Sequence, residues 1–176
     1  MPLLSDARPT ILNSLGSSTP VVASDIMTRR LVTLSPQTDV FDAIDRLLKH
    51  RISGAPVVDA DRNHRFVGLF SERNAVKLLV DAAYEGQVAA TIERFVDAEV
   101  HTITADVDLL SIAQLFLHSN QRRLPVLDDD ERLIGQVSRR DVLKAAHTLM
   151  QDTPDAPHQV LLYLSSLREM AESPFS

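Results

Sequence analysis

The chain has 176 residues, 44% of them hydrophobic, which is enough for one full core or two small cores packed together, so a disordered chain is not expected. Its net charge of −6 gives a surface that repels a phosphate backbone, so nucleic acid is not an expected partner and any bound phosphate needs a local basic site. Cysteine is absent, which excludes disulfides, thiolate metal sites and cysteine nucleophiles and fits a reducing compartment.

Residues 1–20 are rich in Ser, Thr and Pro and are predicted to form a flexible N-terminal arm. The arm has no basic start followed by a sustained apolar segment, as a leader peptide would have. No run in the sequence approaches the roughly 18 apolar residues of a membrane span. We therefore expect a cytoplasmic protein that does not contact a membrane.

The first half of the chain, assigned to residues 21–86, contains patterns for two helices and a hairpin. Apolar residues recur at helical spacing behind Asp39, a residue type that caps helices. Strands are predicted at 55–58, with a proline near the start, and at 65–70, and the turn between them makes an antiparallel hairpin. After Ser71 the apolar period changes from that of a strand to that of a helix.

The second half, assigned to residues 87–150, repeats this order of elements. Asp108 precedes its first predicted helix, and Ser138 precedes its second. The runs 124–127 and 132–137 supply the two strands of the hairpin.

The two halves align with each other as an internal repeat. Thr33 to Asp59 falls on Thr102 to Asp128 at a register of 69 without a gap, and a register of 67 holds after the hairpin turn. The coincident residues are mainly turn and polar positions, so we infer a duplicated β-α-β-β-α unit. A unit of about 60 residues is marginal alone, so the two copies should share a core in an α/β (α+β) fold.

Both halves resemble the cystathionine β-synthase (CBS) domain, which occurs in tandem as a Bateman module. The resemblance covers Ser24 to Met150 and rests on short motifs that recur in fixed order. They are Asp25-Ile26-Met27-Thr28, Ser53-Gly54-Ala55-Pro56-Val57-Val58-Asp59 and Gly68-Leu69-Phe70-Ser71-Glu72-Arg73-Asn74 in the first copy, and Arg122-Arg123-Leu124-Pro125-Val126-Leu127-Asp128 and Gly135-Gln136-Val137-Ser138-Arg139-Arg140-Asp141 in the second. The resemblance implies a pseudo-twofold pair of CBS domains that holds an adenosine-containing ligand, such as AMP, ADP, ATP or S-adenosylmethionine, in a cleft between the copies and regulates another protein.

Two residues of the second copy carry the predicted ligand site. Ser138 stands at a strand-to-helix junction, where unpaired N–H groups and the helix dipole favour an anion. Asp141 projects from the same helical turn and offers two carboxylate oxygens to the hydroxyls of a ribose. The resemblance implies the same roles, a phosphate contact for Ser138 and a ribose contact for Asp141. It adds Arg140 as a further polar contact, and Thr102, Arg123, Leu124 and Pro125 as the border of the base pocket.

The first copy departs from the family pattern because Asn74 replaces the expected aspartate. An amide offers one acceptor atom and an NH₂ group, so binding both ribose hydroxyls should be weaker there. The corresponding weaker site consists of Thr33, Ala55, Pro56, Ser71 and Asn74. An alternative stays open: Ser-x-x-Asp at a helix start is close to a capping box, whose side chains satisfy backbone N–H groups and bind nothing else.

No catalytic or metal site is predicted, and no cofactor is required. The six histidines form no His-x-x-x-His pair, and the acidic run 128–131 fits a solvated turn. No nucleophile elbow, phosphate-binding loop or dinucleotide fingerprint occurs. The function predicted is therefore a nucleotide sensor and not an enzyme. Two alternatives stay open: a ligand-free scaffold for dimerisation or protein interaction, and an enzyme that acts on a nucleotide.

Residues 151–176 are predicted to form a linker, with Pro154 and Pro157, and a C-terminal helix. The helix has an apolar stripe that includes Val160, Leu164 and Leu167. This stripe either packs against the chain's own core or contacts a second subunit or a regulated protein partner. The resemblance to CBS pairs implies a homodimer.

Overall fold

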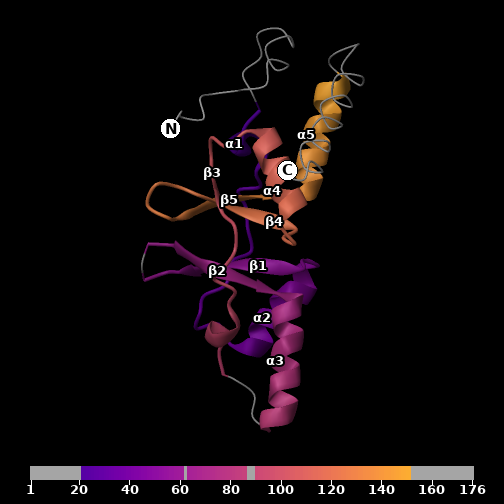
Figure 1. Ribbon diagram of the computed structural model, residues 1–176. Coiled ribbons are helices and arrows are strands. Elements are labelled where there is room, and N and C mark those ends of the chain that lie inside the picture. The colour runs from indigo at the N-terminus through magenta and orange to yellow at the C-terminus, as the bar shows by residue number, and fades with distance from the viewer. Residues whose placement is uncertain (1–20, 62, 87–89, 152–176) are drawn as a thin grey trace, which may run out of the picture.

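Two similar halves lie one above the other in the computed structural model, which describes residues 21–61, 63–86 and 90–151 (Figure 1). The predicted N-terminal arm and C-terminal helix lie outside these residues. The first half contains α2 (Val40–His50), β1 (Gly54–Asp59), β2 (Arg65–Ser71) and α3 (Glu72–Glu85). The second contains β3 (Ile103–Thr104), α4 (Leu109–His118), β4 (Arg123–Leu127), β5 (Leu133–Ser138) and α5 (Arg139–Gln151). Short helices, α1 (Ala23–Ile26) and η2 (Glu93–Phe95), precede the two halves.

Strand pairing confirms the predicted repeat. Val57 pairs with Gly68 in the antiparallel hairpin of β1 and β2, and Val126 pairs with Gly135 in that of β4 and β5. Both hairpins shift register directly after this pair. These positions are 69 and 67 residues apart in the two halves, as the sequence alignment requires.

The first predicted strand of each unit is shorter than a β-α-β-β-α order suggests. In the first half it is a single bridge, in which Leu34 runs parallel to Val57. In the second half it is the two-residue β3, whose Ile103 pairs with Val126. The fold class is mixed α and β as predicted, with small sheets of two and three strands.

The first helix of each half begins where the sequence predicts. Asp39 Oδ1 accepts hydrogen bonds from the backbone N–H of Phe41 at 2.8 Å and Asp42 at 3.4 Å. Asp108 does the same for the first turn of α4, with both N···O distances at 3.0 Å. Burial raises the pKa of Asp108, but hydrogen bonds from the Ser111 hydroxyl and from backbone N–H groups outweigh it, so the pKa lies below its ordinary value.

The apolar residues are divided between two cores, where one shared core was predicted. The first contains residues such as Leu34, Phe70 and Leu78, and the second contains residues such as Ile112, Leu124 and Val137. In each half the helices pack on that half's own hairpin, so the buried apolar side chains form one cluster per half. The prediction of one shared core is therefore wrong.

The segment before each half nevertheless packs on the other half. Ala23 and Met27, in and after α1, belong to the second core, and Ile92, before η2, belongs to the first. The backbone follows the side chains: Thr28 and Gln136 exchange both N–H···O bonds at 2.9 and 3.0 Å, and Asp97 and Leu69 exchange theirs at 2.9 Å. This exchange ties the two halves together, whereas the predicted domain limits follow the order of the chain.

The tips of the two hairpins also meet. Phe66 N donates to Glu131 O at 3.0 Å, Leu133 N donates to His64 O at 3.5 Å, and the Arg65 and Glu131 side chains form an ion pair. These reciprocal contacts give the halves their approximate twofold relation. Within the described part of the chain, no helix has the length and apolar character needed to cross a membrane.

Candidate ligand-binding site

A capping box begins α3 in the first half. The Ser71 N–H donates to Asn74 Oδ1 at 2.9 Å, and the Ser71 hydroxyl donates to the same oxygen in a very short hydrogen bond. The Asn74 N–H donates back to Ser71 Oγ at 3.3 Å. This arrangement satisfies backbone donors of the strand end and of the first helical turn. It also leaves the Asn74 NH₂ group as the side chain's unused hydrogen-bonding group.

The same box begins α5 in the second half, with an aspartate in place of the amide. Asp141 Oδ2 accepts from the Ser138 N–H at 2.9 Å and from the Ser138 hydroxyl at 2.5 Å, and Asp141 N donates to Ser138 Oγ at 3.3 Å. Asp141 Oδ1 has no hydrogen-bond partner among the described residues. Capping is thus present at both helix starts, and one group remains at each: a donor on Asn74 and an acceptor on Asp141.

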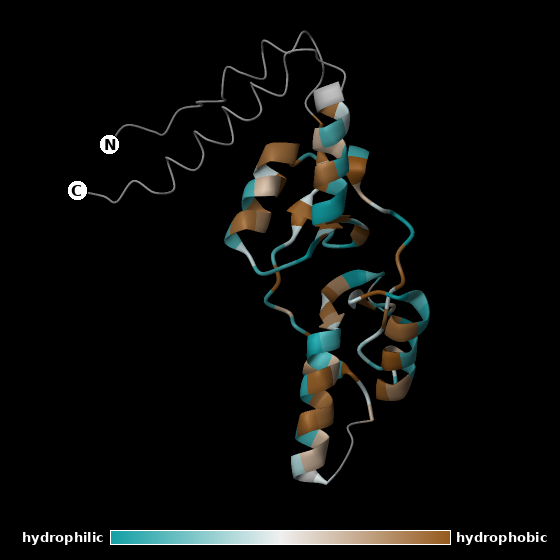
Figure 2. Ribbon diagram, turned by 90° about the vertical axis from the view of Figure 1, so that its right-hand side faces the viewer, coloured by the Kyte–Doolittle hydropathy of each residue, from teal (hydrophilic) through white to brown (hydrophobic). Residues whose placement is uncertain are grey.

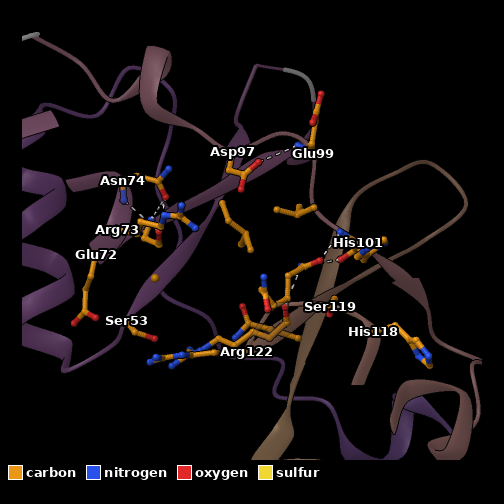
Figure 3. A pocket seen from close by; sticks show the side chains of 18 residues that line it. Ser53, Glu72, Arg73, Asn74, Asp97, Glu99, His101, His118, Ser119 and Arg122 are labelled. Atoms are coloured by element: carbon orange, nitrogen blue, oxygen red, sulfur yellow. Dashed lines mark hydrogen bonds between the residues drawn. The ribbon is translucent and has the colours of Figure 1, made fainter. Parts of the chain in front are cut away.

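A cavity of about 630 Å³ opens between the halves at the start of α3 (Figure 3). Residues from both halves line it. The first half contributes Ser53, Leu69 and Ser71, and the second contributes Arg122 and Gln136, among others. Its size falls within the range of cavities that hold small molecules. A ligand in it would contact both copies of the repeat.

The charges around this cavity are mixed. Arg73, Arg122 and Arg123 line it together with the carboxylates Glu72, Asp97 and Glu99. Figure 3 shows Arg73 and Asn74 on the side of the first half and Arg122 on the side of the second. The guanidinium groups can donate charge-assisted hydrogen bonds to a phosphate. Carboxylates beside them can accept hydrogen bonds from ligand hydroxyls.

Three of the predicted site residues line the cavity: Ser71, Asn74 and Arg123. The other predicted residues are not among those lining it: Thr33, Ala55, Pro56, Thr102, Leu124, Pro125, Ser138, Arg140 and Asp141. The apolar members of this set, Ala55, Pro56, Leu124 and Pro125, are buried, so only their backbone could border a ligand. The cavity lies at the copy predicted to bind more weakly, and ligand contacts by Ser138 and Asp141 stay a prediction.

Apart from Arg123, sequence reasoning did not single out the residues from the second half that line this cavity. Gln121 positions the rim, since its Oε1 accepts from His101 N at 2.7 Å and its Nε2 donates to the carbonyl oxygens of His101 and Arg123 at 3.2 and 3.3 Å. Gln136 was detectable, because the register of 67 aligns it with Leu69, and a glutamine in place of a leucine marks a difference between the copies. Within the described ranges, no group of three or more His, Asp or Glu residues could hold a metal ion.

The family model described as the CBS domain matches this chain twice, at residues 22–81 and 92–148. The two matches correspond to the two halves of the structure. They cover more than half of the sequence.

Three known proteins illustrate the similarity. Inosine-5'-monophosphate dehydrogenase of Methanocaldococcus jannaschii is 30% identical over 122 residues, which are 69% of this chain but only 23% of the enzyme. The crystal structure of CBSX2, from Arabidopsis thaliana, in complex with AMP is 29% identical with a TM-score of 0.65, and the match covers 73% of this chain and 97% of that one. The CBS domain pair of protein MJ0100, solved with 5-methylthioadenosine and S-adenosyl-L-methionine, is 25% identical with a TM-score of 0.59, covering 71% and 98%.

Proposed function

This chain belongs to the CBS domain family, of which it carries two copies, and from that premise we propose that it is a regulatory module that binds an adenosine-containing ligand between them. The observation that carries the proposal is the cavity at the start of α3, which is lined by both copies and contains arginines beside carboxylates. CBSX2 has been solved with AMP, and MJ0100 with two ligands that share the adenosine group. These relatives support AMP, ADP, ATP or S-adenosylmethionine as the class of ligand.

Different side chains around the cavity would contact different parts of the ligand. Arg73, Arg122 and Arg123 supply charge-assisted hydrogen bonds for phosphate oxygens. Asn74 offers its NH₂ group, because its oxygen already accepts from Ser71. Asp97 lines the same cavity and can accept from ribose hydroxyls.

Ligand binding would signal by fixing the relation between the two halves. A ligand that contacts both halves favours the arrangement in which it fits, by its difference in affinity for the two arrangements. The exchanged backbone pairs, Thr28 with Gln136 and Asp97 with Leu69, lie at or beside the cavity and would report that change. A regulated protein partner would bind one arrangement of the two halves more tightly than the other.

A second site at the start of α5 belongs to the same proposal. There Asp141 Oδ1 would accept from a ribose hydroxyl, and Arg140 would contact a phosphate. Thr102 and the backbone of residues 123–125 would border the base. The two sites then differ in character, because one helix start presents a donor and the other an acceptor.

A homodimer is proposed as well, and it rests on apolar side chains that face solvent on the helices. Leu48 and Leu117 are 69% and 74% exposed, and Val76 and Leu143 are 60% and 69% exposed. The two members of each pair occupy equivalent positions of the repeat, so both halves present a similar apolar face. Apolar bands are visible along α2 and α3 in Figure 2. Light scattering should give the mass of two chains, and Leu48→Glu should give monomers at micromolar concentration; a monomeric wild type would refute this part.

Calorimetric titration of the full chain with AMP, ADP, ATP and S-adenosylmethionine tests the proposed function. At a ligand concentration 100 times Kd, binding adds about 2.7 kcal/mol to stability, so thermal unfolding provides a second measurement. No heat and no thermal shift with any of the four would support the ligand-free scaffold instead. Turnover of ATP or ADP that disappears in Asp141→Ala would support the enzyme, whereas a sensor loses affinity and shows no turnover in either form.

A further inference from the structure

Two residues that line the cavity each carry a buried side-chain atom with no hydrogen-bond partner in the described part of the chain. These atoms are Gln136 Oε1, on β5, and Ser119 Oγ, at the end of α4. Gln136 is only 5% exposed and is the one polar residue in the buried set of described side chains. A buried acceptor without a donor lowers stability, so such a group calls for an explanation by a ligand or by bound water.

The backbone of Gln136 fixes where its side chain starts. Its N–H and C=O both pair with Thr28, at 3.0 and 2.9 Å. On either side of it, Gly135 lies against Met27 and Val137 is fully buried in the second core. Because side chains alternate along a strand, Gln136 is turned away from this core and toward the cavity that it lines. Leu69 holds the equivalent position in the first half and lines the same cavity.

We propose that the Gln136 amide reads the edge of a 6-aminopurine ring and so selects adenine over 6-oxopurines in this cavity. A glutamine amide matches the N6/N7 edge of adenine in two hydrogen bonds, with its oxygen accepting from the exocyclic amine N6 and its NH₂ group donating to N7. The last torsion of glutamine is soft, so the amide can turn to meet the ring. The Ser119 hydroxyl supplies a further donor or acceptor at the same cavity.

A 6-oxopurine does not match this amide. On the same edge a 6-oxopurine presents two acceptors, N7 and O6, so the glutamine oxygen would face an acceptor and stay without a donor. The inference rests on the proposed function, since it names the base that the cavity selects. The opposing possibility is that bound water alone satisfies Gln136, in which case the amide has no influence on the choice of base.

Calorimetry with AMP and IMP distinguishes these cases. Wild type should bind AMP at least about tenfold more tightly than IMP. Gln136→Leu, which installs the residue found at the equivalent position 69, should lose that preference. Gln37→Leu, an exposed glutamine outside the cavity lining, is the matched control and should keep it. Purine riboside monophosphate, which lacks the amine, should bind wild type and Gln136→Leu with affinities closer than those for AMP.

Equal affinities of wild type for AMP and IMP, or an unchanged preference in Gln136→Leu, would overturn the inference while leaving the proposed function intact. No binding of any adenosine ligand by wild type would instead overturn the proposed function. Gln136→Leu removes an unpartnered polar group, so its midpoint of thermal unfolding should be no lower than that of wild type. If it does not fold, Gln136→Met, which keeps an unbranched side chain, is measured with the same two nucleotides.

Discussion

The substitution Asp141→Asn separates the two roles that the sequence allows for this aspartate, capping and ligand binding. Only Oδ2 takes part in the capping box, accepting from the N–H and the hydroxyl of Ser138. An asparagine can make the same box, because Asn74 does so at the start of α3. The change therefore preserves the cap and replaces the open Oδ1 by an NH₂ group.

The structure gives different magnitudes for the two roles. If Asp141 only caps the helix, the loss is the interaction of one negative charge with the helix dipole, about 0.3–1 kcal/mol of unfolding free energy. If Oδ1 also accepts from a ribose hydroxyl, binding loses a charge-assisted hydrogen bond of about 1.5–3 kcal/mol, or a factor of roughly 10 to 150 in Kd. The affinity for AMP should therefore fall much more than the stability.

Two measurements on the same samples test this reasoning: denaturant unfolding for stability and calorimetry for the affinity for AMP. Asp42→Asn is the matched control, because Asp42 lies in the first turn of α2, a helix start that belongs to neither proposed ligand site. It should cost a similar amount of stability and leave the affinity unchanged. An Asp141→Asn protein with wild-type affinity would refute the ligand role, and a stability loss above about 2 kcal/mol would refute the equivalence of the two caps.

Three further substitutions have expected outcomes that simpler measurements check. Gly68→Ala should lower the free energy of unfolding by about 3 kcal/mol in denaturant unfolding, because the added Cβ would lie 2.3 Å from the backbone oxygen of Asp97. Gly135→Ala should lower it by about 1 kcal/mol, because its Cβ would meet the flexible Met27 side chain. Equal losses of stability in the two variants would contradict this. Arg122→Ala should weaken AMP about fivefold and leave adenosine unaffected, and an equal loss for both would rule out a phosphate contact. Asp108→Ala should cost about 1 kcal/mol at pH 7 as a lost helix cap. Because the pKa of Asp108 is lowered in the folded protein, its contribution to stability is complete above the unfolded pKa of 3.8 and is lost as pH falls through the folded pKa. The difference in stability between wild type and Asp108→Ala should therefore shrink below about pH 4. A difference independent of pH would contradict this reasoning.

The sequence predicted the repeated local structure because the signals for it are local. Asp39 and Asp108 cap the helices they precede, and the hairpins pair Val57 with Gly68 and Val126 with Gly135 at the predicted registers. The chemistry of the capping boxes also followed from residue types three positions apart. A reader of the sequence could therefore identify the family and both helix starts.

The sequence favoured the helix start at Ser138 for the ligand site, and the structure shows a cavity at the start of α3 instead. The local pattern at 138–141 is the better match to the family, yet the cavity adjoins Asn74, because the walls come from the distant segments 97–101 and 118–123. The burial of Gln136 is likewise a tertiary feature, since its backbone pairs with the distant Thr28 and its side-chain oxygen has no partner among the described residues.

By itself, the sequence determined two equal units, their caps and their turns, since each depends on residues within a few positions of one another. Only the tertiary structure decided that each unit lends its preceding segment to the other, placing Met27 in the second core and Ile92 in the first. The physical reason is that burying an apolar side chain is favourable wherever it fits, whatever its distance along the chain. Whether a segment packs in the core of its own half or of the other half therefore depends on the complementary shape of the two surfaces, which no local sequence pattern specifies.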